Sequence, residues 1–377
     1  MRLGINGWRI HGQRTGVGRY LLNIVRHWDR EMIGDRFEEV TFYVQKPVDR
    51  SQIPLPENIQ VKVLRPDAPM LVWENLRFGP SAPEEILFCP SYTRPLVAHG
   101  KCVVTTFEAT LKLYPQYFPR SAWYSLPQLY LPLYQWSAHH AALVLTTTEA
   151  AKLDIIRAYG VPEEKIRVVY IAPPDVFQPL GEDARLPEIR RRYLSDDVPF
   201  FLFVGKLTPR RNVPKLMEAL AVFKRRTQQP HKLMVVGLNT TGIDIAGRAR
   251  ELGIEKDFVY TGYVPDEDLI LLYNAAHAFV LPYSYEAGAS LTALEAQAAG
   301  LPVITVDTPG LRETTGNEAL YMAEAEVPDM VEAMTRAAQD LEFRRGLSEG
   351  GLRFARQFSW RRTAAETLAV LEEAART

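Results

Sequence analysis

Short apolar runs alternate with segments of helical periodicity along the whole of this 377-residue chain. Apolar runs of four or five residues are typical of strands buried on both faces, and apolar residues spaced by three or four indicate amphipathic helices. In the segment 17–28, for example, Leu21, Ile24, Val25 and Trp28 form one apolar stripe. This alternation predicts an α/β protein in which parallel sheets carry helices on both faces.

The predicted strands fall into two groups, which indicates two doubly wound domains in series. They are residues 2–6, 40–44, 61–64, 86–89, 103–106, 143–146 and 167–170, followed by 200–204, 233–236, 258–261, 278–281 and 303–306. A stretch rich in proline and charge separates the groups, with one short helical pattern at 188–193. We therefore predict an N-terminal domain over 1–175, a linker over 176–198, a C-terminal domain over 199–357, and a last segment over 358–377 whose helix begins after an N-cap at Ser359.

Composition and charge exclude several classes of protein. The chain has 44 Lys and Arg against 45 Asp and Glu, so no overall positive field would attract nucleic acid. Cys89 and Cys102 lie apart without zinc-site spacing, which excludes a disulfide scaffold and favours two buried free thiols. Because the sequence shows neither a signal peptide nor a long apolar run, we expect a soluble cytoplasmic protein.

Ligands of open parallel sheets bind at the carboxyl ends of the strands, so residues just after a predicted strand are the first candidates for a site. Gly16 and Gly18 open the first helix, where small residues let backbone N–H groups approach a phosphate or a sugar. A plain tight turn is the alternative. Leu21 stands where a dinucleotide-binding fingerprint has its third glycine, which disfavours a nicotinamide cofactor.

The loop after strand 200–204 carries three cations. Lys206, Arg210 and Arg211 follow Gly205, and Pro209 among them predicts a loop rather than a helix face. Two such cations can grip a diphosphate. Solvated surface cations are the structural alternative.

The segment 286–295 predicts a second anion-binding element, because it runs from a loop into the start of a helix. Glu295 lies about one turn into that helix and could bind a sugar hydroxyl, whereas Glu286 on the loop could touch a sugar. The alternatives are a capping box between Thr292 and Glu295, and a solvent-exposed loop acid at Glu286.

No metal site is predicted. Asp266, Glu267 and Asp268 precede an apolar helical pattern, so they are explained as acids in the first turn of a helix. The histidines show no H-x-x-x-H spacing.

Residues 111–136 are rich in aromatic side chains, which could line a ligand groove or touch a membrane interface. Only Lys112 and Arg120 lie nearby as cations, so a core helix with a loop is favoured. The aromatic residues are Tyr114, Tyr117, Phe118, Trp123, Tyr124, Tyr130, Tyr134 and Trp136.

Taken in order, these motifs resemble the family 4 glycosyltransferases over almost the whole chain. The resemblance rests on residues 16–20, 114–119, 160–166, 205–212, 262–269 and 291–296. It implies the GT-B fold, in which two Rossmann-like domains face a cleft and the last helix crosses back to the N-terminal domain. It also implies metal-independent transfer of a sugar from a nucleotide-diphosphate donor with retention, in which the departing phosphate helps to deprotonate the acceptor.

The resemblance assigns roles to individual residues. Lys206 and Arg211 would hold the donor diphosphate, Glu286 would approach the donor sugar, and Glu295 would hold the ribose hydroxyls. Tyr263 and Val264 would border the base, and backbone N–H groups of three residues at 290–292 would assist the cations. The implied donor-binding residues are Gly16, Gly18, Gly205, Tyr263, Val264, Gly288, Ser290, Leu291, Thr292 and Glu295.

Two departures from the family pattern stand out. On the acceptor side, Phe107 and Glu108 replace a common His-Asp pair, so a polar contact to the donor sugar is absent or supplied otherwise. Eight residues rather than seven separate Glu286 from Glu295, which leaves the position of Glu286 less fixed.

The sequence therefore predicts a glycosyltransferase that uses a GDP- or UDP-linked hexose or deoxyhexose, with mannose as one candidate, and no cofactor. The acceptor would be a saccharide or a lipid-linked sugar in polysaccharide or glycoconjugate synthesis, and peripheral contact with the inner face of a membrane is compatible with it. A glycosidase is disfavoured because a neutral saccharide gives the loop cations nothing to neutralise. A catalytically weak nucleotide-sugar binding or regulatory subunit stays open.

Overall fold

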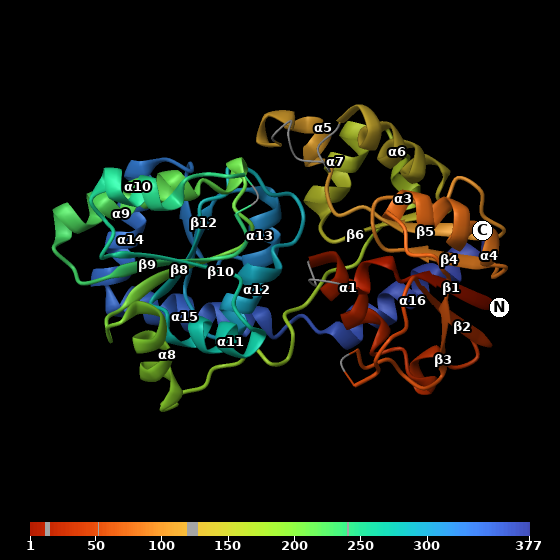
Figure 1. The fold of residues 1–377 in the computed structure, drawn as a ribbon, viewed down its shortest axis with the longest axis horizontal. Coiled ribbons are helices and arrows are strands. Elements are labelled where there is room, and N and C mark those ends of the chain that lie inside the picture. The colour runs from red at the N-terminus through yellow and green to blue at the C-terminus, as the bar shows by residue number, and fades with distance from the viewer. Residues whose placement is uncertain (12–15, 52, 119–126, 240) are drawn as a thin grey trace. The chain divides into compact units, whose positions relative to one another are not determined.

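The computed structural model describes residues 1–11, 16–51, 53–118, 127–239 and 241–377. They form two compact units (Figure 1). Among the described residues, unit 1 consists of those in 1–113, 127–172 and 358–377, and unit 2 consists of those in 114–118 and 173–357. Each unit is described by itself below.

Unit 1 is built on a seven-stranded parallel sheet with the strand order β3-β2-β1-β4-β5-β6-β7. The winding of the chain reverses between the neighbours β1 and β4. The strands are β1 (Arg2–Asn6), β2 (Glu39–Val44), β3 (Ile59–Val63), β4 (Ile86–Cys89), β5 (Lys101–Thr105), β6 (Leu143–Thr146) and β7 (Ile166–Val168).

Helices surround this sheet, and the apolar stripe predicted for the first of them is buried at every position. Leu21, Ile24, Val25 and Trp28 are inaccessible to solvent, although the helix ends at Val25 rather than at Trp28. The helices of unit 1 are α1 (Gly16–Val25), α2 (Arg30–Ile33), α3 (Met70–Trp73), α4 (Gly79–Ser81), α5 (Thr110–Leu113), α6 (Pro127–His140), α7 (Glu149–Tyr159), α16 (Trp360–Arg376), the 3-10 turns η1 (Trp8–Ile10) and η5 (Glu163–Lys165), and the π-helix η2 (Glu74–Phe78).

The last helix, α16, completes the core of unit 1. Ser359 caps it by accepting a hydrogen bond from the Arg362 N–H at 3.2 Å, as predicted. The Trp28 indole donates to the Ala364 carbonyl at 3.0 Å, and the Thr363 hydroxyl donates to the Tyr170 carbonyl at 2.7 Å. Because these bonds join residues about 200 to 340 positions apart, the C-terminal segment is part of the fold of the N-terminal sheet.

Unit 2 is built on a six-stranded parallel sheet with the order β10-β9-β8-β11-β12-β13. The central strand β8 is buried at all five positions, as expected for a strand covered on both faces. Figure 1 shows helices α9 and α10 on one side of this sheet and α8, α11 and α15 on the other. The strands are β8 (Phe200–Val204), β9 (Lys232–Val236), β10 (Phe258–Gly262), β11 (Ala278–Leu281), β12 (Val303–Val306) and β13 (Leu320–Met322).

The α/β class and the predicted strands are confirmed, with shifts of one or two residues at several ends. Among the described strands, sequence analysis missed only β13, a three-residue strand inside the short apolar run 319–323. Both cysteines are buried free thiols, as predicted. The helical elements of unit 2 are α8 (Arg185–Leu194), α9 (Val213–Thr227), α10 (Ile245–Leu252), α11 (Asp266–Ala275), α12 (Leu291–Ala298), α13 (Pro309–Thr315), α14 (Val327–Gln339), α15 (Leu341–Ala355), η3 (Pro115–Tyr117) and η6 (Pro209–Arg211).

A buried carboxyl group lies at the carboxyl end of β1 in unit 1. Glu74, on the π-helix η2, is 1% exposed, and its Oε1 accepts a hydrogen bond from the Asn6 side-chain amide at 2.9 Å. Its Oε2 is buried without a hydrogen bond among the described residues. Burial raises the pKa of Glu74 from 4.5 to about 7, so the folded protein holds a proton there that the unfolded chain releases.

We expect stability to fall as the pH rises from 4.5 to above 7, because the folded state binds more protons than the unfolded state in that window. Each pKa unit is worth about 1.4 kcal/mol, so the loss should approach roughly 3 kcal/mol. Glu74→Gln, which keeps the acceptor for Asn6 but cannot ionise, should flatten this dependence in chemical unfolding at pH 5 and pH 8. The exposed Glu57→Gln is the control, and equal pH dependence in wild type and Glu74→Gln would contradict the assignment.

Candidate functional site

The winding of unit 2 reverses between β8 and β11, so the loops that follow these two strands lead away in opposite directions. In open parallel sheets such a reversal opens a crevice at the carboxyl ends of the strands, where ligands bind. The loop after β8 holds residues 205–212, and the loop after β11 holds residues 282–290. The candidate residues predicted in both loops are therefore brought to one place.

Two glycines allow the loops that follow β8 and β9 to approach each other closely at this point. Gly205 and Gly237 have φ values of +153° and +138°, and a Cβ on Gly237 would lie 2.1 Å from the Gly205 carbonyl oxygen. A Cβ on Gly205 would lie 2.5 Å from Nη1 of Arg211. The glycine at position 205 thus leaves the space that the Arg211 guanidinium occupies.

Arg211 is held in place by two contacts and has a buried N–H donor without an acceptor among the described residues. Its Nη1 donates to the Lys206 carbonyl at 2.9 Å, and its guanidinium carbon lies 5.0 Å from the ring centre of Tyr283, a cation–π contact. Its Nε is buried without a hydrogen-bond acceptor among the described residues. A buried N–H of a cation that lacks an acceptor indicates a place for an anion. The Lys206 side chain is exposed beside it.

Arg210 pairs with Glu286 and thereby ties the two loops together. The ion pair spans 3.5 Å from Nη2 to Oε2, and the two side chains are only 12 and 9% exposed. Asn212 adds hydrogen bonds to the Pro282 carbonyl and the Ser284 hydroxyl, each 2.7 Å long. The interpretation of Glu286 as a solvated loop acid is wrong, because its partner from the other loop buries it.

The start of α12 differs in part from the prediction. Ser290 caps the helix through its side chain, and its N–H donates to the Thr314 hydroxyl at 3.2 Å. In this structure the Thr314 hydroxyl is thus the acceptor of the Ser290 N–H that was expected to help hold a diphosphate. Leu291 and Thr292 form the first turn, where helical N–H groups have no acceptor within the helix. Gly288, just before them, is buried.

Glu295 lies in the second turn of α12 and is 1% exposed. Its Oε2 accepts a hydrogen bond from the Tyr273 hydroxyl at 3.1 Å. The capping box between Thr292 and Glu295 is wrong, because Ser290 is the cap.

The two residues expected to border the nucleobase of the donor differ in solvent exposure. Tyr263 is 60% exposed, whereas Val264 is buried in the core of unit 2.

In unit 1, the helix predicted after Gly16 begins at that residue. A Cβ on Gly18 would lie 2.6 Å from the Arg9 carbonyl oxygen, so Gly18 is needed for close packing of α1, whereas Gly16 has open space around it.

Phe107 and Glu108 also have structural partners in unit 1. The Phe107 ring packs edge-on against Tyr20, with 5.0 Å between centroids, and against Tyr92. Glu108 accepts a hydrogen bond of 2.6 Å from the Thr110 hydroxyl at the start of α5. The side chain that replaces the family's usual histidine therefore joins an aromatic cluster.

Asp266, Glu267 and Asp268 form the first turn of α11, as predicted. Asp268 binds Arg192 at 3.0 Å and the Tyr193 hydroxyl at 2.6 Å. Across the described ranges, no three His, Cys, Asp or Glu side chains gather as metal ligands.

The aromatic stretch 111–136 divides between the two units. Tyr130 and Tyr134 lie on α6 and pack together, and Tyr134 also packs on Tyr92. Tyr114 lies against Tyr285 in unit 2, 4.3 Å between centroids. Trp123 and Tyr124 lie outside the described residues.

Comparison with known proteins supports the resemblance seen in the motifs. Residues 14–172 match the model for Glycosyltransferase Family 4, and residues 187–353 match the model for glycosyl transferases group 1. The chain belongs to the group 1, family 4 glycosyltransferases. Its two parallel-sheet units form the GT-B fold.

Individual relatives match different lengths of this glycosyltransferase. The O-antigen chain mannosyltransferase B of Escherichia coli is 27% identical over 374 residues, 94% of this chain and 95% of that protein. The alpha-D-kanosaminyltransferase of Streptomyces kanamyceticus is 27% identical over 225 residues, 58% of each chain. The structure of Anabaena HepE in complex with UDP and glucose has a TM-score of 0.77 at 16% identity, over 98% of both chains.

In the described part of the chain, every helix is too short or too polar to span a membrane.

Sequence analysis missed three residues that shape the site: Arg210 as the partner of Glu286, Asn212 as the link between the loops, and Tyr283 as the surface under Arg211. Opposite charges in the loops after two predicted strands could have suggested the first pair. The roles of Asn212 and Tyr283 depend on which strands are neighbours, which the sequence does not state.

We expect Gly205→Ala to weaken the binding of a nucleoside diphosphate at least tenfold, because the new methyl group displaces the Arg211 guanidinium and strains the backbone at this φ. Isothermal titration calorimetry measures the effect. Gly346→Ala in α15, where a Cβ meets no atom within 4 Å, is the control and should leave binding unchanged. Equal affinity for both variants would contradict the role given to Gly205.

Proposed function

We propose that this glycosyltransferase moves a hexose or deoxyhexose from a nucleoside-diphosphate donor to a saccharide or lipid-linked acceptor, with retention and without a metal ion. The observation that carries the proposal is the Arg211 guanidinium, fixed on Tyr283 with a buried N–H that lacks an acceptor, at the winding reversal of unit 2. A diphosphate supplies the acceptor oxygens that this site lacks.

The proposed chemistry follows from where negative charge develops. When the bond between the sugar and the diphosphate breaks, charge accumulates on the leaving diphosphate, and fixed cations stabilise that charge more in the transition state than in the bound substrate. Lys206 and Arg211 are proposed for this role, with the N–H groups of Leu291 and Thr292 at the positive end of α12. Glu295, oriented by Tyr273, is proposed for the ribose hydroxyls.

Glu286 is proposed as the group nearest the transferred sugar, held by Arg210. A paired carboxylate stays ionised and can accept hydrogen bonds from sugar hydroxyls. We place no separate general base, because the departing phosphate can take the acceptor proton.

Relatives favour particular donors. A mannosyltransferase matches over nearly the whole chain, which favours mannose and a polysaccharide product. The fold neighbour bound to UDP and glucose favours UDP as a second nucleotide to test beside GDP. If the acceptor is lipid-linked, the protein would contact the membrane surface peripherally to reach it.

A thermal-shift screen tests the donor. We expect either GDP or UDP to raise the melting temperature more than its monophosphate does, because a ligand that binds only the folded state stabilises it by mass action. ADP, CDP and dTDP complete the panel. A panel in which no diphosphate exceeds its monophosphate would contradict the proposed diphosphate grip.

Arg211→Ala should lower turnover by a factor of roughly 10² to 10³, the cost typical of removing one preorganised charge-stabilising donor. The control is Arg226→Ala, an exposed arginine on α9. Circular dichroism and the melting temperature verify the fold, and unchanged turnover in Arg211→Ala would overturn the assignment.

Phe107 motivates the second candidate, a catalytically weak nucleotide-sugar binding or regulatory subunit, because its ring is packed on Tyr20 and offers no polar contact. Donor binding without transfer and without slow donor hydrolysis would favour this alternative. Release of labelled sugar from the donor would exclude it.

A further inference from the structure

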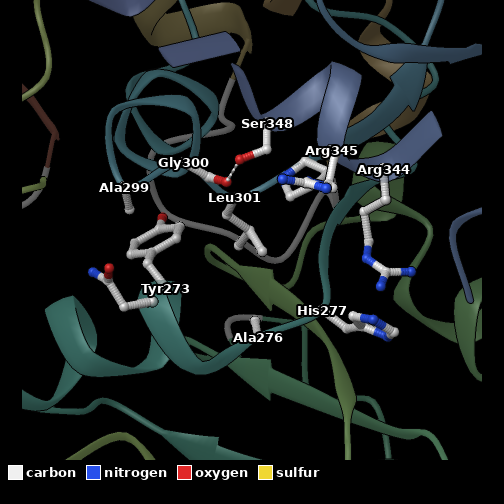
Figure 2. Close-up of a pocket in the computed structure, with 11 residues that line it drawn as sticks. Tyr273, Ala276, His277, Ala299, Gly300, Leu301, Arg344, Arg345 and Ser348 are labelled. Atoms are coloured by element: carbon white, nitrogen blue, oxygen red, sulfur yellow. Dashed lines mark hydrogen bonds between the residues drawn. The ribbon is translucent and has the colours of Figure 1, made fainter. Parts of the chain in front are cut away.

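Unit 2 has a cavity of about 220 Å³ at the amino ends of its strands, whereas the candidate donor site lies at their carboxyl ends. His277 directly precedes β11, and Leu301 lies in the turn that leads into β12, so both lie at the amino ends of the strands. Arg344, Arg345 and Ser348 of α15 form one wall, and Tyr273 of α11 contributes to another (Figure 2). The whole cavity lies within one unit.

The cavity is rich in cationic and donor groups. Two arginines and a histidine line it, and none of its lining residues within the described chain is an Asp or Glu. Arg344 uses Nη1 to bind the Ala337 carbonyl at 2.7 Å, and Figure 2 shows its guanidinium extending toward His277. The Ser348 hydroxyl donates to the Gly300 carbonyl at 2.5 Å. Two positive groups in a lining without a carboxylate favour an anion.

His277, which lines the cavity, has one ring nitrogen that is not used by its histidine neighbour. His277 Nδ1 lies 2.5 Å from Nε2 of His231, whose Nδ1 is buried without a hydrogen bond among the described atoms. A neutral imidazole has one N–H, so the His231 proton belongs on Nε2, where it has an acceptor. His277 Nδ1 then accepts, and its own proton is on Nε2. Burial and the nearby Arg344 lower the pKa of His277 to about 4, so this neutral tautomer is the form at pH 7.

We propose that this cavity binds the phosphate group of a small phosphate monoester, with Arg344, Arg345 and His277 as donors. Three donor groups suit the three terminal oxygens of a monoester better than the two of a carboxylate. The remaining lining, which includes Tyr273, Ala276, Leu301 and Pro302, offers an apolar surface for a compact organic group such as a hexose.

The cavity lies at the far end of the helix that begins at the candidate donor site. Helix α12 runs from Leu291 to Ala298, and the turn that follows it lines the cavity. Tyr273 also lines the cavity, and its hydroxyl holds Glu295 at 3.1 Å. A ligand in the cavity should therefore change the affinity for the nucleoside diphosphate. This coupling rests on the proposed function, because it requires a diphosphate at the donor site. The binding of a phosphate monoester in the cavity does not depend on the proposed function.

The proposal is tested by titrating the protein with glucose 1-phosphate and with inorganic phosphate at constant ionic strength. Binding is measured by calorimetry and by the shift of the His277 NMR signal. Wild type and Arg211→Ala should bind glucose 1-phosphate equally, because Arg211 lies at the other edge of the sheet. Arg345→Gln should weaken binding roughly tenfold or more, the usual effect of losing a charge-assisted hydrogen bond. Arg353→Gln, an exposed arginine on the same helix, should change nothing. Inorganic phosphate should bind more weakly than the monoester.

Several results would overturn the proposal. Binding that disappears in Arg211→Ala but persists in Arg345→Gln would place the phosphate at the donor site instead. A lower melting temperature of Arg345→Gln with an unchanged His277 titration would show that the arginine only stabilises helix ends. An absence of any His277 shift at millimolar ligand would show that the cavity does not bind phosphate. Because these readouts need no sugar transfer, failure of the proposed function leaves them interpretable.

Discussion

The reversal of winding between β8 and β11 is the constraint on which the candidate site depends. Because the chain leaves β8 toward β9 and returns to β11 on the other side, the loops after these strands diverge and leave backbone and side chains accessible between them. The close approach of Gly237 to the Gly205 carbonyl fixes the first loop at this point. A side chain at either position would move the loop that carries the cations.

The two neighbouring arginines of that loop have different physical tasks. Arg210 is neutralised by Glu286 in a pair largely shielded from water, and removing one member of such a pair leaves an uncompensated charge. Arg211 instead rests on an aromatic ring and on a backbone carbonyl, which orient it without neutralising it. One cation thus holds the loops together, and the other is the one proposed to bind the donor diphosphate.

Unit 1 has the same kind of reversal, between β1 and β4, but surrounds it with different chemistry. There the carboxyl end of β1 meets a buried glutamic acid whose pKa burial raises to about 7, and Phe107 joins a cluster of aromatic rings after β5. The groups proposed to bind the donor diphosphate, which are Lys206, Arg211 and the start of α12, lie in unit 2.

Local patterns in the sequence determined the strands, most helices, the Ser359 cap and the loops in which the site residues lie, because periodicity and capping depend on residues a few positions apart. The family resemblance added roles for Lys206, Arg211 and Glu295. Only the tertiary structure decided which of these groups are partnered: Arg210 with Glu286, Tyr273 with Glu295, and the Ser290 N–H with Thr314. These contacts join residues 22 to 76 positions apart, and they form only after the sheet has fixed which strands are neighbours.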